Sequence, residues 1–148
     1  MGGYKTVVVG TDGSDSSLRA VDRAGQLASG PDSKVIVATA YLPSQEDTHS
    51  ADVLKDEGYK VTGSAPIYDI LRDARDRATK AGAVNVEERA IVGAPVDALV
   101  DLAVEVGADL LIVGNLGLSS IAGRLLGSVP ANVARRAKTD VLIVHTTG

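Results

Sequence analysis

The fold class can be inferred from Leu110-Leu111-Ile112-Val113, a stretch that follows Asp109 and ends at Gly114. Continuous apolar residues of this length, bounded by a charge and a glycine, are typical of a strand that is buried on both faces of a parallel sheet. Similar runs, also rich in β-branched residues, occupy residues 6–9, 35–38 and 141–144. A half-polar run at residues 86–92 predicts a further strand nearer an edge of the sheet.

Between these runs the hydrophobic period changes to that of a helix. Ser14 and Asp15 are candidate caps for the first helix, and Pro95 stands at a first-turn position of the third. The helical patterns cover residues 18–28, 67–81, 95–107 and 129–137. Strands that alternate with helices predict an α/β fold of order β-α-β-α-β-α-β-α-β, a five-stranded parallel sheet sandwich.

The composition limits the chemistry that the side chains can perform. The chain has 148 residues, of which 45% are apolar and 23% charged, with two His and no Cys, Trp or Phe. This length and apolar content predict a single domain over residues 1–148 with a substantial core. Because the chain has no Cys, thiol nucleophiles, disulfides and Cys-ligated zinc are excluded. His49 and His145 are the only histidines, so a His-rich metal site or a Ser-His-Asp hydrolase is a poor candidate.

Charge and hydropathy bear on partners and location. The net charge of −4 and the aromatic content of 3% predict no nucleic-acid partner, because such partners favour basic surfaces and aromatic stacking platforms. No run approaches the roughly 20 consecutive apolar residues that a membrane span needs. The first residues lack the basic and apolar regions of a signal peptide. The sequence therefore predicts a cytoplasmic protein with no membrane partner.

Two glycine-rich turns follow predicted strands. Gly10-Thr11-Asp12-Gly13 comes after the first, and the turn from Gly114 to Ser128 comes after the run at 110–113. Ligands of open α/β sheets bind at the carboxyl ends of strands near the topological switch point, and glycine lets backbone amides approach an anion there. The turns thus predict a phosphate site, while their spacing is equally typical of tight turns with helix caps. The P-loop and G-x-G-x-x-G patterns are absent.

The second turn carries a more specific motif. Gly114, Gly117 and Gly127, the last followed by Ser128, fit the spacing G-2x-G-9x-G-[S/T], which resembles the nucleotide-binding signature of the universal stress protein family. Residues 8–14 resemble the family's first strand and Asp-bearing turn, and the resemblance covers nearly the whole chain. It implies a Rossmann-like, adenine nucleotide α-hydrolase-like fold. It also implies a protein that binds ATP or cyclic AMP/AMP as a sensor, buffer or regulator in stress response.

The resemblance further implies where the nucleotide lies. Asp12 would be near the ribose, or would hold a Mg or Mn ion if a triphosphate is bound. The adenine would meet residues 38–41, although Tyr41 is more simply interpreted as a core-edge residue. The phosphates would meet the glycines of the second turn and Ser128. The residues expected to bind nucleotide are Gly10, Thr11, Asp12, Ala38, Ala40, Tyr41, Gly114, Asn115, Gly117, Gly127, Ser128 and Val129, and no catalytic residue is assigned.

One departure from the family bears on the choice of nucleotide. Many triphosphate-binding members carry a basic or imidazole side chain between the first two glycines, where this chain has Asn115 and Leu116. Charge-assisted contacts are roughly twice as strong as neutral ones, so a ligand with one phosphate charge loses less here than a triphosphate does. The sequence therefore predicts no strong preference for ATP over cyclic AMP.

An enzyme is the alternative function. Residues 11–16 partly resemble the S-G-G-x-D-S pyrophosphate loop of adenylating α-hydrolases, but Asp12 replaces a glycine and would repel a pyrophosphate unless a metal lay between them. Slow ATP hydrolysis is a lesser possibility, with no general base evident beyond Asp12. A phosphorylatable Asp after the third strand, as in a response-regulator receiver, and an aromatic platform for a flavin are both absent from the sequence.

Two further segments have expected roles. The long connection from Leu42 to Ala65 is either a lid or interface segment or a tolerated insertion, because loops beyond about 12–15 residues in compact domains are usually functional or mobile. The family resemblance implies a homodimer formed through the last strand, at Val141, Leu142, Ile143 and Val144.

Overall fold

The computed structural model describes residues 4–41, 65–115 and 128–145 of the chain. Strands and helices alternate along these residues, as the sequence predicts. The strands are β1 (Thr6–Gly10), β2 (Lys34–Tyr41), β3 (Val86–Val92), β4 (Leu110–Gly114) and β5 (Asp140–Val144). The helices are α1 (Asp15–Leu27), α3 (Ala65–Ala81), α4 (Pro95–Glu105) and α5 (Ser128–Arg136). The connection at 42–64, with His49, lies outside the described residues.

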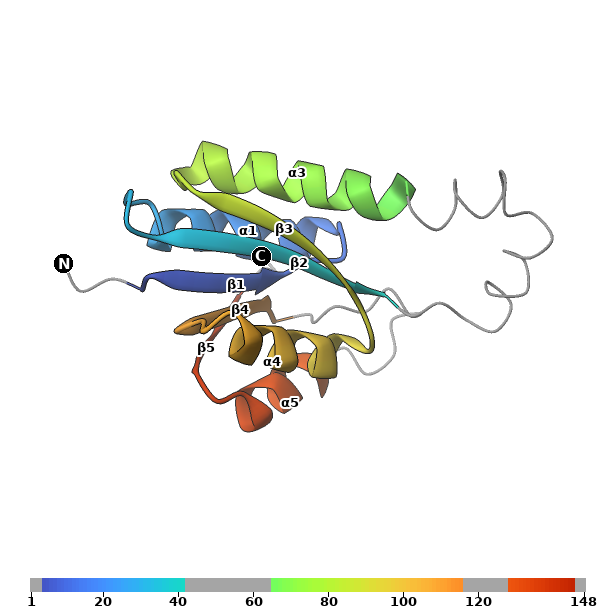
Figure 1. The fold of residues 1–148 in the computed structure, drawn as a ribbon. Coiled ribbons are helices and arrows are strands. Elements are labelled where there is room, and N and C mark those ends of the chain that lie inside the picture. The colour runs from blue at the N-terminus through green and yellow to red at the C-terminus, as the bar shows by residue number, and fades with distance from the viewer. Residues whose placement is uncertain (1–3, 42–64, 116–127, 146–148) are drawn as a thin grey trace.

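The five strands form one parallel sheet in the order β3-β2-β1-β4-β5, which confirms the predicted fold class (Figure 1). Gly10 of β1 is paired with Ala38 of β2, and Val9 of β1 is paired with Ile112 of β4. The chain moves outward from β1 through β2 to β3 and then returns to the other side of β1 as β4. The direction of winding therefore reverses between β1 and β4, and this is the topological switch point of the sheet.

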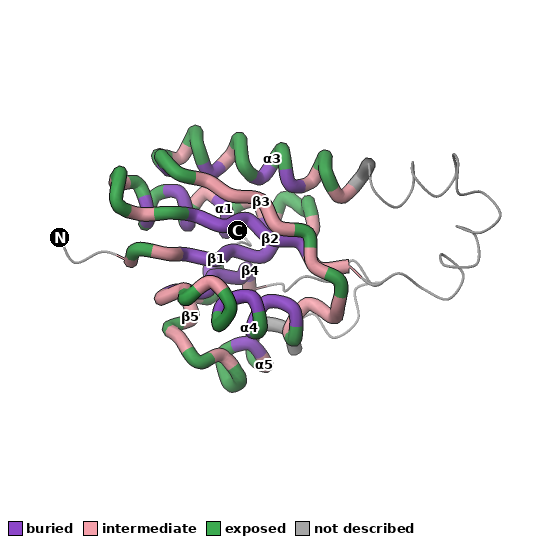
Figure 2. The backbone as a smooth tube through the Cα atoms, viewed as in Figure 1, coloured by how far each residue is buried: buried purple, intermediate pink, exposed green. Residues whose placement is uncertain are grey.

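Helices cover both faces of the sheet. In Figure 1, α1 and α3 lie on one face and α4 and α5 on the other. Because successive side chains of a strand point to opposite faces, Val7 and Val9 pack in the core beneath α1 and α3, whereas Val8 packs in the core beneath α4. The strand β4 is buried along its length, and β1 is buried after its first residue (Figure 2). Two separate cores explain why the strand runs are apolar without alternation.

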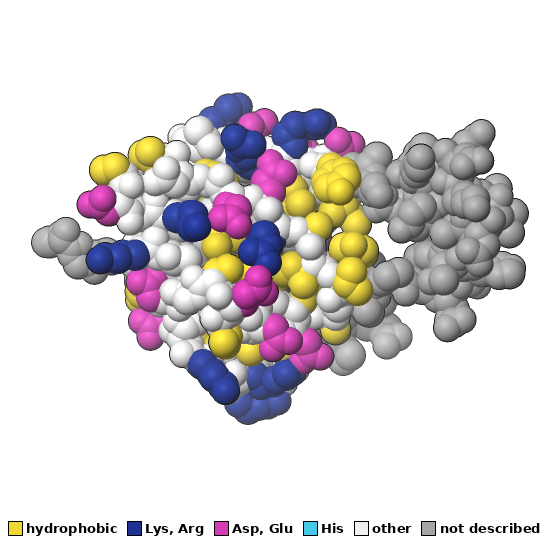
Figure 3. All heavy atoms as spheres, viewed as in Figure 1, with side chains coloured by type: hydrophobic (Ala, Val, Ile, Leu, Met, Phe, Trp, Pro, Cys, Tyr) yellow, Lys and Arg dark blue, Asp and Glu magenta, His cyan; other side chains and the backbone are white. Residues whose placement is uncertain are grey.

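The edge of the sheet at β3 carries charged side chains. The edge strand β3 carries Glu87, Glu88 and Arg89, and its half-polar character confirms the prediction of a strand at an edge. Lys34 Nζ lies 3.2 Å from Glu87 Oε1, and Arg89 Nη2 donates to Glu105 Oε2 at 2.8 Å. Basic and acidic side chains are interspersed over the face shown in Figure 3. Such charges protect an exposed strand from pairing with other chains.

Local sequence signals set several helix ends. Ser14 is the N-cap of α1, where its side chain accepts a hydrogen bond from the Ser17 amide. Pro95 opens α4, and Gly107 follows the helix with a φ of +68°, which glycine adopts without strain. Arg135 and Arg136 occupy the last turn of α5, whereas Lys138 lies beyond the helix. Across the described ranges, every helix is too short or too polar to cross a membrane.

Candidate functional site

The ends of β1, β2 and β4 meet at the switch point. Gly10 and Gly114 end β1 and β4 and are buried, and the amide of Thr11 donates to the carbonyl oxygen of Ala38 at 2.9 Å. Asn115 continues from β4, and its amide donates to the Val144 carbonyl oxygen at 2.8 Å. The sheet therefore places three of the segments that the sequence singled out at one edge.

The strand β2 continues beyond the end of β1. Gly10 pairs with Ala38, whereas Ala40 and Tyr41 pair only with β3. Both Ala40 and Tyr41 are half-buried, and the carbonyl oxygen of Tyr41 accepts from the Gly93 amide at 2.8 Å. The end of β2 thus forms a wall beside the turn that follows β1.

The remaining predicted residues belong to the second glycine turn. Gly117 and Gly127 lie outside the described residues. Ser128 and Val129 open α5, so the predicted helix start is confirmed. A helix N-terminus favours negative charge through its dipole and its unpaired amides, and α5 is the helix that connects β4 to β5.

The turn after β1 uses its own amides internally. The amide of Asp12 donates to Ser17 Oγ at 3.3 Å, the amide of Gly13 to Thr11 Oγ1 at 3.0 Å, and the amide of Ser14 to Asp12 Oδ1 at 3.0 Å. A pyrophosphate loop needs such amides for its ligand. The geometry of this turn is therefore that of a capped strand-to-helix turn that presents a carboxylate.

Asp12 is the charged group of this turn. It is half-buried, and Oδ1 accepts the Ser14 amide. Oδ2 has no hydrogen bond or ion pair to another residue in the described parts of the chain. A carboxylate oxygen accepts hydrogen bonds from hydroxyl groups and binds hard cations. Asp12 therefore suits a ligand hydroxyl or a metal ion that is shared with a phosphate.

Sequence reasoning missed two neighbours of this turn. Ser17, which is 1% exposed, is hydrogen-bonded to three residues of the turn, and Ile70 of α3 lies against Gly13. Gly13 has a φ of +87°, and a Cβ atom there would lie 3.0 Å from Ile70 Cγ1. Ser17 interrupts the apolar face of α1 one turn before Val21, and this polar residue in a buried stripe is the signal that could have identified it.

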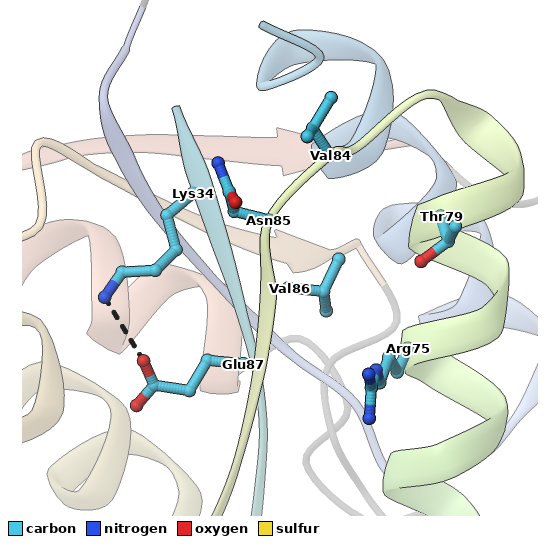
Figure 4. A pocket seen from close by; sticks show the side chains of 7 residues that line it. All are labelled: Lys34, Arg75, Thr79, Val84, Asn85, Val86 and Glu87. Atoms are coloured by element: carbon cyan, nitrogen blue, oxygen red, sulfur yellow. Dashed lines mark hydrogen bonds and ion pairs between the residues drawn. The ribbon is translucent and has the colours of Figure 1, made fainter. Parts of the chain in front are cut away.

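Two other features of the described residues bear on chemistry. Among residues 4–41, 65–115 and 128–145, no group of three or more His, Asp or Glu side chains could hold a metal ion, and His145 is exposed after β5. A pocket of about 530 Å³ lies beside the first residues of β2 and β3, at the opposite end of these strands from Asp12 (Figure 4). The lining residues are Lys34, Arg75, Thr79, Val84, Asn85, Val86 and Glu87. Lys34 is paired with Glu87 and Arg75 with Glu88, so both basic side chains that line the pocket are already paired with carboxylates.

The fold and the switch-point site define a class of α/β proteins that bind ligands at the carboxyl edge of a parallel sheet. The model of the universal stress protein family matches residues 3–145 of the chain. Universal stress protein Rv1636 of Mycobacterium tuberculosis is 76% identical over 147 residues, which are 99% of this chain and 100% of that protein. The chain therefore belongs to the universal stress protein family.

Solved structures agree with this assignment. A universal stress protein in complex with cAMP has a TM-score of 0.75 and 66% identity, and the match covers 98% of this chain and 99% of that one. The universal stress protein from Archaeoglobus fulgidus in complex with dAMP has a TM-score of 0.66 and 26% identity, over 95% of this chain and 97% of that one. The family fold predicted from the sequence is confirmed.

Proposed function

We propose that this protein binds an adenine nucleotide across the ends of β1, β2 and β4. The observation that carries the proposal is the cAMP complex of a relative that is 66% identical over 98% of this chain. The dAMP complex of a more distant relative supports the same ligand class. The two ligands, dAMP and cyclic AMP, share the adenine ring, a five-membered sugar ring and one phosphate group, so the shared chemistry is that of an adenine nucleotide with a single phosphate.

The described geometry supports one arrangement of the nucleotide. The adenine lies along the end of β2, at Ala38, Ala40 and Tyr41, where the strand continues past β1. The sugar lies at Asp12, whose Oδ2 accepts a hydroxyl. The phosphate is held by the second glycine turn and the start of α5. The proposed phosphate-binding residues are Gly114, Asn115, Gly117, Gly127, Ser128 and Val129, while Gly10 and the backbone of Thr11 line the site.

A triphosphate needs more positive charge than a monophosphate. Asn115 brings none to the turn after β4. Mg²⁺ is commonly held by one or two carboxylates together with substrate phosphates, and Asp12 fits that donor set as a single protein ligand. We therefore propose that Asp12 holds Mg or Mn only when ATP is bound, and that cyclic AMP and AMP bind without a metal.

The site supports binding rather than catalysis. Asp12 is the titratable side chain that residues 10–14 offer, and the amides of this turn are engaged within it. A pyrophosphate leaving group would therefore meet a carboxylate and few available donors here. We propose that the protein acts as a nucleotide sensor, buffer or regulator of stress response, as a single cytoplasmic domain.

Calorimetric titration tests this function. The wild-type protein is titrated with cyclic AMP, AMP and ATP, each with and without Mg²⁺, and Asp12→Asn is compared with Asp32→Asn. Asp32 is exposed in the turn before β2, at the other end of the strands, so its variant makes the same change of charge away from the site. We expect binding that Asp12→Asn weakens and Asp32→Asn leaves unchanged. Absence of heat with all three nucleotides at millimolar concentration would contradict the proposed function.

The last strand supports a homodimer. The strand β5 forms the edge of the sheet opposite β3, and Ile143 is 41% exposed there, with Val141 and Leu142 half-buried. An apolar edge strand is prone to pair with another strand. We propose that two copies associate through residues 141–144. Sedimentation analysis should show a dimer that Ile143→Lys converts to a folded monomer; a monomeric wild-type protein would contradict the proposal.

A further inference from the structure

Two buried hydroxyl groups lie beneath the Asp12 turn. Thr11 and Ser17 are each 1% exposed, and their Oγ atoms are 2.7 Å apart. One follows β1 and the other lies in the first part of α1, so the contact joins the strand end to the helix that the turn connects. A buried hydroxyl costs free energy unless its hydrogen-bonding capacity is met. The pair therefore needs partners for its donors and acceptors within the turn.

The protons of the network can be assigned from its partners. Ser17 Oγ lies 3.0 Å from the carbonyl oxygen of Ser14, which can only accept, and 3.3 Å from the amide of Asp12, which can only donate. A serine hydroxyl donates one proton and accepts two. Ser17 therefore donates to Ser14, and the hydroxyl of Thr11 donates to Ser17. Thr11 Oγ1 in turn accepts the amide of Gly13 at 3.0 Å.

This network surrounds Asp12 on both sides. It holds the amides of Asp12 and Gly13 and the carbonyl group of Ser14, and the amide of Ser14 then fixes Asp12 Oδ1 at 3.0 Å. The turn is consequently held at three neighbouring residues by two side chains that are buried beneath it. A turn held in this way keeps its carboxylate in one place before any ligand arrives, which lowers the entropic cost of binding.

We propose that Thr11 and Ser17 are positioning residues, which hold the Asp12 carboxylate where it accepts a hydroxyl group of the nucleotide sugar. This inference rests on the proposed function and assigns to the buried pair a role in ligand affinity. Because both side chains are buried beneath the turn, they act through Asp12 and not by touching the ligand. Because the amides of Asp12 and Gly13 already donate to these two hydroxyls, they are not available to bind a phosphate group at this turn.

The test combines variants that remove a hydroxyl group with variants that keep it. Thr11→Val keeps the shape of the side chain and removes the hydroxyl, whereas Thr11→Ser keeps the hydroxyl. Ser17→Ala removes the centre of the network, and Ser33→Ala is its matched control, because the Ser33 hydroxyl donates to the Tyr4 carbonyl oxygen at 2.9 Å at the far end of the sheet. Thermal unfolding of each variant shows which remain folded at the temperature of the binding measurement.

Binding of cyclic AMP and AMP is then measured by calorimetry. We expect Ser17→Ala and Thr11→Val to weaken binding about tenfold, because each removes one or two of the hydrogen bonds that hold the turn. Thr11→Ser and Ser33→Ala should bind with near wild-type affinity. In an Asp12→Ala background, Ser17→Ala should weaken binding no further, whereas its effect on thermal stability should persist. That difference separates positioning from a merely structural role.

The possible outcomes are distinct. Equal effects of Ser17→Ala with and without Asp12, or wild-type affinity in both Ser17→Ala and Thr11→Val, would overturn the positioning role and leave the proposed function intact. Absence of binding by the wild-type protein would overturn both. Amide hydrogen exchange gives a readout without ligand: the amides of Asp12 and Gly13 should exchange slowly in the wild type and in Thr11→Ser, and faster in Ser17→Ala. Fast exchange of both amides in the wild type would also overturn the proposal.

Discussion

Gly25 of α1 lies so close to α3 that a Cβ atom at this position would be 2.5 Å from the carbonyl oxygen of Ala78 and 2.9 Å from the Cβ atom of Ala81. Both α1 and α3 cover the same face of the sheet. Because the closest atom belongs to the backbone of a helix, it cannot move aside as the end of a flexible side chain can. The absence of a side chain at Gly25 therefore fixes the separation of the two helices.

The first prediction concerns this contact. Glycine in a helix is about 1 kcal/mol less favourable than alanine, so Gly25→Ala would stabilise an isolated helix. Overpacking of a core typically costs about 1–3 kcal/mol, and here we expect it to dominate and to lower the free energy of unfolding. Urea denaturation measures the effect. The control is Gly30→Ala, since a Cβ atom at Gly30 meets nothing within 4 Å. Equal stability of the two variants would contradict the close approach.

The second prediction concerns an ion pair between the same helices. Arg77 Nε donates to Asp22 Oδ1 at 3.0 Å, and Nη2 donates to Asp22 Oδ2 at 2.6 Å. The hydrogen bonds that Arg77 donates to Asp22 raise the pKa of Arg77 above its ordinary value. A bidentate pair is stronger than an ordinary surface pair, but both side chains are more than one third exposed, so solvent screens them.

We expect a double-mutant cycle of Arg77→Ala and Asp22→Ala to give a coupling free energy of about 0.5–1 kcal/mol, reduced in 1 M NaCl. The pair of Arg72 and Asp69 is a matched control within α3, because it is more exposed and has a single contact of 2.7 Å. Its coupling should be smaller, about 0.3 kcal/mol. Chemical denaturation of the single and double variants measures both values, and equal coupling in the two pairs would refute the prediction.

The third prediction concerns acid stability. Asp109 Oδ2 accepts the amide of Lys5 at 3.0 Å, and Oδ1 accepts the amide of Thr6 at 2.9 Å, so this carboxylate ties the start of β1 to β4. Burial raises the pKa of Asp109, but the hydrogen bonds from the two amides outweigh burial, and the pKa lies below its ordinary value. The charged form is therefore favoured in the folded protein.

A lowered pKa in the folded state means that the stabilisation is complete above the unfolded pKa of about 3.9 and is lost as the pH falls through the folded pKa. Asp109→Asn should lower the free energy of unfolding at pH 6 by about 1–2 kcal/mol, because its NH₂ group cannot accept an amide. The difference from wild type should shrink between pH 4 and the folded pKa. Urea midpoints of the two proteins across that range test this prediction. If the difference between the midpoints stays constant with pH, the charge of Asp109 does not cause the stabilisation.

The strands could be predicted because they are buried on both faces. At Leu110 to Val113 and in β1, burial on both sides leaves apolar residues without alternation, and that pattern is visible in one dimension. Charges at Glu87 and Arg89 marked the edge strand in the same way. The meeting of Gly10 and Gly114 followed from a rule of topology, which places neighbouring strand ends at one edge.

The contacts that join α1 to α3 and those that hold the turn after β1 could not be predicted in this way. Arg77 and Asp22 are separated by 55 positions in the sequence, and no local pattern pairs them. Thr11 and Ser17 are near in sequence, and the apolar stripe of α1 indicates that Ser17 is buried, but the groups that the two hydroxyls bind are not visible in a list of residues. The engagement of the amides after β1 depends on distances of a few ångström, which only the folded backbone defines.

The fourth prediction concerns the choice between nucleotides, and it starts from Asn115. The backbone of this residue is fixed by the hydrogen bond from its amide to the Val144 carbonyl oxygen at 2.8 Å, which a side-chain substitution leaves in place. Its half-buried position directly after β4 puts it at the start of the glycine turn that we propose to hold phosphate. A lysine at this position would add one positive charge beside the phosphate groups.

Asn115→Lys should therefore increase affinity for ATP over cyclic AMP by about threefold to tenfold, because a charge-assisted contact is stronger with the more highly charged ligand. The gain should shrink as the salt concentration rises, since mobile ions screen a partly exposed charge. Competition between the two nucleotides, measured by calorimetry at low and high salt, gives the ratio of affinities directly. Gln26→Lys adds the same charge at an exposed position of α1 and controls for the change in net charge. If both variants shift the ratio equally, the side chain at 115 does not face the phosphates, and the phosphate position that we propose is wrong.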